Sequence, residues 1–223
     1  MSKPVAATKL SGKLAGSSMG VLAAIDDRAH SADGKGNPVF AIARLQRDVG
    51  NGSRVGLVYT GRFDGGAVNQ VAGLDTRLTF GGRVGLNLQA AASRSSLAGQ
   101  HQDGSLWNGA LTVSGRRFNF RYSIDAISDD FRTRSGFVGR GAVANLRLVN
   151  QVTFYGGSGG LVERVSFDLS PLLTWRYQDL VGGAGAQDHK YHLNANARLR
   201  GGWNVSGSLL YEFQKFDPGF YAP

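Results

Sequence analysis

The sequence contains no cysteine, only 5 prolines in 223 residues, and no long apolar run. Without cysteine, a disulfide framework and a cysteine-based metal site are excluded, although the compartment is not fixed. No stretch approaches the roughly 18 consecutive apolar residues of a membrane-spanning helix. A membrane β-barrel escapes that test, because only every second residue of its strands has to be apolar.

The first residues also lack the apolar core of a secretory signal peptide. They read Met-Ser-Lys-Pro-Val-Ala-Ala. We therefore interpret residues 1–6 either as disordered or as a start that was added or trimmed, with the export signal absent or removed. We treat the remainder as a single domain.

The sequence is rich in glycine and in positive charge, with 33 glycines and a formal net charge of +9. A basic protein suits nucleic acid, anionic lipid headgroups or an anion-favouring pore. The arginines are dispersed singly along the chain rather than clustered in one arm or helix. This dispersal argues against nucleic acid as a partner.

The clearest pattern is a two-stranded hairpin from Tyr191 to Phe213. Its first strand alternates strictly, with Tyr191, Leu193, Ala195, Ala197 and Leu199 on one side and His192, Asn194, Asn196, Arg198 and Arg200 on the other. Such period-two alternation predicts a β-strand with two unlike faces. The polar side is too charged for a dry core, and hydrocarbon outside with water inside suits both faces.

The same unit recurs along the whole chain and predicts an all-β protein of about twelve antiparallel strands. We expect strands near residues 7–14, 19–25, 39–49, 54–63, 71–80, 84–90, 106–114, 118–126, within 138–155, and near 164–178, 191–200 and 203–213. The spacing of roughly 18 residues per strand and connection exceeds that of soluble sandwiches and suits strands tilted across a bilayer. The predicted fold class is an antiparallel transmembrane β-barrel of the bacterial outer membrane.

Two positions break the pattern. Pro171 cannot donate a hydrogen bond to a neighbouring strand, so we expect an edge, a bulge or a break there. Asn150 falls on the apolar side of its strand, which predicts either a bulge or a place at the membrane rim.

The connections alternate in length, which predicts how the barrel is oriented. Short glycine-rich turns follow the odd-numbered strands, and longer loops are expected at 30–38, 64–70, 96–104, 128–136 and 180–189. Because outer-membrane barrels have short periplasmic turns, both chain ends would lie outside, where complete bacterial barrels do not end. We therefore expect an internal segment of a larger barrel, of about 14 strands or more, with Phe216–Phe220 leading into a further loop.

Several segments resemble a known family. They read A-A-T-K-L-S-G-K-L, A-R-L-Q-R-D-V, A-G-L-D-T-R-L-T-F and S-D-D-F-R-T-R-S-G-F-V-G-R. In this order they are similar to the C-terminal barrel, a domain of unknown function, of outer-membrane proteins that carry an N-terminal family-9-like carbohydrate-binding module. The resemblance spans most of Ala7–Phe220 and implies an outer-membrane location with a link to carbohydrate binding. It supplies no catalytic residues.

The candidate functional residues form one inward-facing polar row. Charges on the lipid side would cost about 2–4 kcal/mol each near the bilayer centre, so they should face the lumen. The predicted lumen-lining residues are Lys9, Lys13, Arg44, Asp48, Asp75, Arg77, Arg121, Asp125, Arg147, Arg164, Asp168, Arg176, Asn194, Asn196, Arg198 and Arg200. Two arrangements stay open: pairs that plug the interior, or a wet pore that favours anions.

Other chemistry has little support in the sequence. His189 and His192 should point to opposite faces of a strand, which is poor for binding one metal ion. No Gly-x-Ser-x-Gly elbow occurs, although a barrel hydrolase can assemble its site from distant strands. We predict no cofactor and no metal.

The predicted function is a passive pore or a membrane anchor linked to glycan binding or uptake. Its partners would be the lipid bilayer with lipopolysaccharide, together with glycans or a partner protein. The alternatives are a structural barrel subunit that docks a partner and, third, a barrel-embedded hydrolase.

Overall fold

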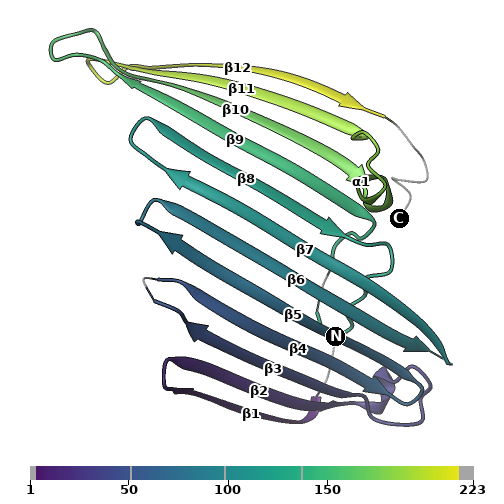
Figure 1. The fold of residues 1–223 in the computed structure, drawn as a ribbon. Helices are drawn as coiled ribbons and strands as arrows, with labels where there is room; N and C mark the ends of the chain where they lie inside the picture. Colours follow the sequence, from purple (N-terminus) through teal and green to yellow (C-terminus); the bar gives the residue numbers. More distant parts are fainter. Residues whose placement is uncertain (1–3, 51, 98, 137, 216–223) are drawn as a thin grey trace. The chain divides into compact units, whose positions relative to one another are not determined.

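The fold is known from a computed structural model that describes residues 4–50, 52–97, 99–136 and 138–215 (Figure 1). These residues form twelve strands, one short 3-10 helix and one short α-helix. The all-β prediction is confirmed. No helix among the described residues is both long enough and apolar enough to cross a membrane.

The strands are long and follow one another without crossovers. Their order in one sheet is the sequence order, β1 to β12, and the neighbouring strands whose register is known are antiparallel. The strands are β1 (Pro4–Leu14), β2 (Ser17–Asp26), β3 (Val39–Asp48), β4 (Arg54–Asp64), β5 (Ala67–Phe80), β6 (Val84–Leu97), β7 (Gln100–Ser114), β8 (Phe118–Ile127), β9 (Val143–Tyr155), β10 (Val162–Arg176), β11 (Asp188–Leu199) and β12 (Asn204–Gln214). The helices are η1 (Arg28–His30) and α1 (Tyr177–Val181).

The sheet is open within the described residues, with β1 and β12 as its edge strands. β1 already begins at Pro4, so half of the start that we expected to be disordered is strand. Residues 1–3 and the expected loop entry at Phe216–Phe220 lie outside the described residues.

The chain divides into two compact units. Unit 1 comprises Met1–Leu78, Asn87–Asn108 and Ile127–Ala142, and unit 2 comprises Thr79–Leu86, Gly109–Ala126 and Val143–Pro223.

Both units have strands with two unlike faces. In unit 1, Leu10 lies opposite Val21, which lies opposite Ala43. In unit 2, Phe167 lies opposite Ala195 and Val152. Side chains that face one another across strands thus repeat the alternation of the sequence. We call the side that carries these residues the apolar face and the opposite side the polar face.

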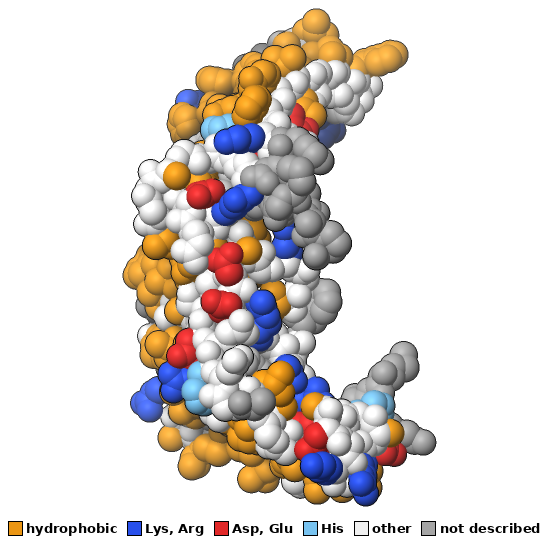
Figure 2. Space-filling view, turned by 90° about the vertical axis from the view of Figure 1, so that its right-hand side faces the viewer, with side chains coloured by type: hydrophobic (Ala, Val, Ile, Leu, Met, Phe, Trp, Pro, Cys, Tyr) orange, Lys and Arg blue, Asp and Glu red, His pale blue; other side chains and the backbone are white. Residues whose placement is uncertain are grey.

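Most large apolar side chains of the apolar face are not covered by protein. Leu10 is 72% exposed and Leu209 is 68% exposed. Hydrophobic side chains gather along one side of the surface in view, and charged side chains lie mainly away from them (Figure 2). Four of the six buried hydrophobic residues in the described part of the chain are alanines: Ala67, Ala110, Ala126 and Ala144. The other two are Val71 and Phe131.

Two of the predicted long loops are wrong. The connection between β4 and β5 consists of Gly65 and Gly66, and β6 ends only three residues before β7 begins. Asn69 and Gln70 are polar and the segment 100–104 contains no apolar side chain, and this composition favoured a loop. The strands nevertheless continue there, because pairing with a neighbouring strand does not require an apolar face. The loops at 128–136 and after β2 and β10 remain long.

Pro171 neither ends nor displaces its strand. β10 runs unbroken past it, although Ser170 and Pro171 have no paired partners on β9. The register is the same on both sides of that gap, so the prediction of an edge, a bulge or a break is wrong. The end of β10 also differs from the prediction, since Tyr177 begins α1.

Asn150 lies on the apolar face without a bulge. It is paired with Leu169 in regular register. The Tyr122 hydroxyl donates a hydrogen bond of 2.6 Å to its side-chain oxygen. This partner, contributed by β8, satisfies the amide among apolar neighbours.

Candidate functional site: the polar face

The strand registers place the predicted lumen-lining residues of β1, β3, β5, β9, β10 and β11 on the polar face, with one exception. Arg121 and Asp125 of β8 fall on the same face by alternation from Asn119, which is hydrogen-bonded to Gln151. Lys9 lies opposite Leu22, and Asp168 lies opposite Asn194 and Gln151. Arg200 is the exception, because β11 ends at Leu199 and Arg200 belongs to the following turn. That these residues line a lumen remains a prediction.

A bidentate ion pair on the polar face joins Arg44 of β3 to Asp75 of β5. The guanidinium makes two hydrogen bonds to the carboxylate, and the one from Nη2 measures 2.9 Å. The two side chains meet over Gly56 of the intervening β4. A Cβ atom on Gly56 would lie 2.7 Å from Arg44 Nη2, so the missing side chain makes room for the pair.

Further ion pairs are looser and more exposed. Lys13 lies 3.6 Å from Asp48, and Arg198 lies 3.1 Å from Glu163. Several cations of the polar face have no ion pair or side-chain hydrogen bond within the described residues: Lys9, Arg77, Arg121, Arg147 and Arg164. The polar face therefore carries an excess of unpaired positive charge.

In unit 2 the polar face is connected by side-chain hydrogen bonds between strands. Asn119 of β8 donates to Gln151 of β9 at 3.1 Å. Gln151 in turn donates to Asp168 of β10 at 2.7 Å. On the neighbouring strand, Asn196 and Arg198 are exposed. This part of the polar face is held together laterally and remains open.

In unit 1 a loop covers part of the polar face. We call residues 128–136, which follow β8, the cover loop. Asn69 of β5 fastens it from both sides, because its side chain donates to the Arg132 carbonyl at 3.0 Å and accepts from the Arg134 N–H at 2.7 Å. Asn69 is only 1% exposed.

Two other strands also hold the cover loop. The Arg132 N–H donates to the hydroxyl of Ser93 on β6 at 3.1 Å. The Ser128 hydroxyl accepts from the N–H of Ser105 on β7 at 2.8 Å. Gly104 permits the closest approach, since a Cβ there would lie 2.2 Å from the Phe131 backbone nitrogen. The cover loop is thus packed tightly against β5, β6 and β7.

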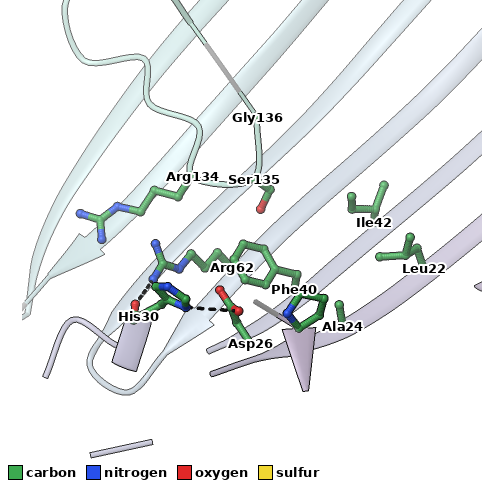
Figure 3. A pocket seen from close by; sticks show the side chains of 11 residues that line it. Leu22, Ala24, Asp26, His30, Phe40, Ile42, Arg62, Arg134, Ser135 and Gly136 are labelled. Atoms are coloured by element: carbon green, nitrogen blue, oxygen red, sulfur yellow. Dashed lines mark hydrogen bonds and ion pairs between the residues drawn. The ribbon is translucent and has the colours of Figure 1, made fainter. Parts of the chain in front are cut away.

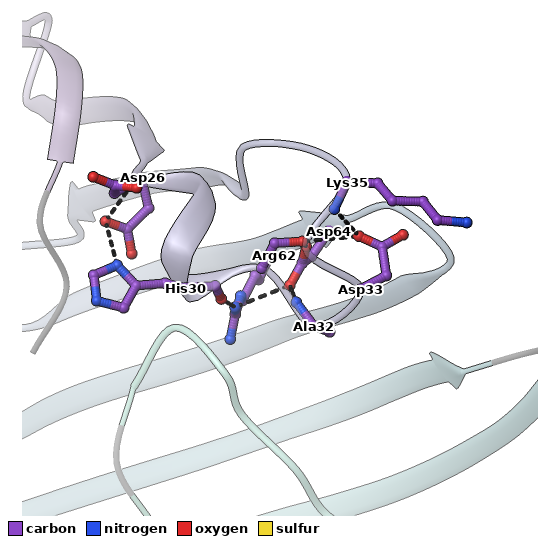
Figure 4. Close-up of polar contacts among 9 residues, drawn as sticks. Asp26, His30, Ala32, Asp33, Lys35, Arg62 and Asp64 are labelled. Carbon is purple, nitrogen blue, oxygen red and sulfur yellow. Dashed lines mark hydrogen bonds and ion pairs between the residues drawn. The ribbon is translucent and has the colours of Figure 1, made fainter.

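A buried polar cluster anchors the loop between β2 and β3 (Figure 4). Asp64, at the end of β4, accepts from the Ser31 hydroxyl at 2.7 Å, the Ala32 N–H at 2.8 Å and Arg62 at 3.0 Å. Arg62 also donates to the His30 carbonyl at 2.8 Å. Asp64 is 2% exposed, and these charge-assisted bonds compensate for its burial.

The exposed tip of that loop contains a perturbed carboxylate, Asp33. The Lys35 N–H and then the Ser31 hydroxyl donate to it, each at 2.9 Å, and both lower the pKa of Asp33 below its usual value.

A cavity of about 690 Å³ lies between the cover loop and β2–β4 (Figure 3). Its apolar lining comes from the polar face itself and comprises Leu22, Ala24, Phe40 and Ile42, together with Pro4. Its polar lining comprises Asp26, His30, Arg62, Arg134 and Ser135, next to Gly136. The Arg62 guanidinium lies 5.5 Å from the centre of the Phe40 ring, within cation–π range.

The arrangement of polar groups in this cavity does not form a known catalytic constellation. His30 Nδ1 lies 3.4 Å from the Asp26 carboxylate. The Ser135 hydroxyl, however, has no hydrogen-bond partner among the described residues, so it is not coupled to His30 as a nucleophile to its base. Within the same residues, no group of three or more His, Asp or Glu side chains is placed to hold a metal ion.

The two clustered histidines lie on opposite faces of β11, as predicted. His189 is opposite Leu173 on the apolar face, whereas His192 is opposite Ser170 on the polar face. His189 contacts the Phe213 ring, and His192 contacts the Ser208 hydroxyl at 2.8 Å.

The sequence did not indicate the residues that fasten the cover loop. Asn69 and Gly104 fall in segments that were predicted to be loops, and Ser93 follows the predicted end of its strand. The only available signal was the glycine in an otherwise polar stretch, because a strand glycine often marks the close approach of another backbone.

Comparisons with known proteins do not assign the chain to a family. No family model matches the chain, and neither a curated protein nor a solved structure gives a significant match. The resemblance to the barrel of carbohydrate-binding outer-membrane proteins therefore stays a prediction.

Proposed function

We propose that the chain forms most of the wall of a β-barrel in a bacterial outer membrane and acts there as a passive pore or membrane anchor. The observation that carries this proposal is the two-faced register of the strands. Exposed apolar side chains occupy one face, and most of the charged and amide side chains of the strands occupy the other. A patch of exposed apolar residues on this scale suits a lipid surface.

The charged residues of the apolar face support a membrane environment. Arg47 lies opposite Ser17 and Val55 on that face, one residue from the end of β3. Arg94 and Asp103 pair at 2.7 Å near the ends of β6 and β7. Charge on the lipid side costs about 2–4 kcal/mol at the bilayer centre and close to nothing at the interface. Strand ends are the positions where such charge is tolerated.

The edge strands support a larger barrel. β1 and β12 each leave one row of backbone groups without a strand partner in the described sheet. Unpaired backbone groups are costly in hydrocarbon, and a closed barrel removes both edges. We propose closure by additional strands, to a total of about 14 or more.

The excess of unpaired cations on the polar face supports a water-filled lumen that favours anions. The lipid bilayer with lipopolysaccharide is the partner of the apolar face. The link to glycan binding or uptake rests on the family resemblance alone.

A structural barrel subunit that docks a partner is the second candidate. The cover loop favours it, because a loop that covers the polar face reduces the space through which solutes pass. Conductance distinguishes the two functions.

Planar-bilayer recording with the purified, detergent-folded barrel, including the strands that close it, tests the proposal. The pore predicts stable single-channel currents with a preference for chloride over potassium. A folded, membrane-inserted protein without conductance would support the structural subunit instead. A protein that is monodisperse without detergent would contradict both membrane functions.

A further inference from the structure

A plain barrel wall does not require the cover loop, which lies over the polar face. Strands of this length need only tight turns, and the β4–β5 connection shows that two glycines are enough. The connection after β8 instead places residues 128–136 over the polar face of β5–β7.

The attachment of this loop is built into the strands. Asn69 and Ser93 are 1% and 3% exposed, and both direct their polar atoms to the loop backbone. A buried amide that donates and accepts at once holds the loop in one position. Release would leave the Asn69 side-chain oxygen without its donor, while the amide nitrogen would keep only its hydrogen bond of 2.9 Å to the Ser95 hydroxyl. Gly104 removes the side chain that would prevent the contact.

The cover loop also brings a free cation to the cavity. Arg132 is occupied, because its guanidinium donates to the Asp129 and Phe131 carbonyls at 2.6 and 3.0 Å. Arg134 is exposed, and its guanidinium has no partner within the described residues (Figure 3). It lines the same cavity as Arg62, whose Nη2 is ion-paired with Asp64 and whose Nε atom has no hydrogen-bond acceptor within the described residues.

We propose that the cover loop is a fixed constriction of the lumen and that Arg134, together with Arg62, selects small anions there. This inference rests on the proposed pore. A loop fastened to the inner side of a barrel narrows the passage, and a cation without a partner at the narrow part lowers the energy of a passing anion. The fixed backbone keeps that cation in place.

The test is single-channel recording in a KCl gradient with the complete barrel, including the strands that close it. Arg134→Glu should shift the reversal potential toward that of potassium. Lys35→Glu makes the same charge change on the exposed loop after β2 and should leave the reversal potential unchanged. Asn69→Ala, which releases the loop, should raise the conductance and weaken the anion preference.

The outcomes separate the two proposals. A conducting wild type with an unchanged reversal potential in Arg134→Glu overturns the role of Arg134. An unchanged conductance in Asn69→Ala overturns the constriction and leaves the pore standing. Arg134 is an exposed side chain, so its replacement does not depend on refolding of the buried attachment. A silent wild type with silent variants overturns the pore itself and the constriction with it.

Discussion

The polar faces of β5–β7 in unit 1 and of β9–β11 in unit 2 have the same origin and different surroundings. Both arise from strict alternation along long antiparallel strands. In unit 1 Asn69 is buried under the cover loop and makes hydrogen bonds to its backbone. In unit 2 Gln151 links neighbouring strands, and Asn196 remains exposed. Alternation therefore determines on which face of the sheet a side chain lies. Whether that side chain is buried or exposed depends on whether a loop covers the face.

The largest expected difference in stability between the two regions comes from adding one methyl group to a glycine. Gly104→Ala places a Cβ 2.2 Å from the Phe131 nitrogen, which is backbone and yields little. We expect a loss of about 3 kcal/mol in the free energy of unfolding, as for a severe overpacking change. Gly207→Ala on β12 meets no atom within 4 Å and should be close to neutral. Urea unfolding in lipid vesicles, followed by tryptophan fluorescence, measures both, and equal effects would contradict the tight packing of the cover loop.

A second pair compares the same amide in the two regions. Asn69→Ala leaves the Arg132 carbonyl and the Arg134 N–H without partners and should cost about 2 kcal/mol. Asn194→Ala on the open face of β11 should cost less than about 0.5 kcal/mol, as at ordinary surface positions. The same unfolding assay applies. A cost for Asn194→Ala as large as that for Asn69→Ala would show that the unit 2 face is covered as well.

A smaller effect is expected at the pair that crosses Gly56. A double-mutant cycle with Arg44→Ala and Asp75→Ala should give a coupling energy of about 1 kcal/mol, because the pair is bidentate but partly exposed to solvent. Gly56→Ala should reduce the coupling by displacing the guanidinium. A coupling energy indistinguishable from zero would show that the pair contributes only to charge balance.

The smallest effect concerns Asp33. Its pKa is lowered in the folded protein, so its contribution to stability is present above the unfolded pKa and disappears as the pH falls through the folded pKa. Ser31→Ala removes one donor and should raise the pKa of Asp33 toward its ordinary value. A carboxyl-detected NMR titration measures the change, and an unchanged midpoint would rule out the Ser31 hydrogen bond.

The sequence predicted those features of the fold that depend on the alternation of apolar and polar residues. The number of strands, their order and the faces of Arg44, Asp75 and Asp168 could be read because the period of a strand is two. The lengths of β5, β6 and β7 could not, because the polar stretches at 69–70, 93–96 and 100–104 resemble loops in composition. The attachment by Asn69, Ser93 and Gly104 depends on a contact between residues far apart in the sequence, and no local pattern encodes such a contact.

The central claim is that the apolar face meets lipid and the polar face meets water. The chain contains no cysteine, so single cysteines carrying a fluorophore or spin label at positions 193 to 198 of β11 can report each side chain in turn. In vesicles, labels at Leu193, Ala195 and Ala197 should be quenched by lipid-borne quenchers, and those at Asn194, Asn196 and Arg198 by water-soluble ones. Uniform accessibility to the water-soluble quencher along the strand would contradict the account.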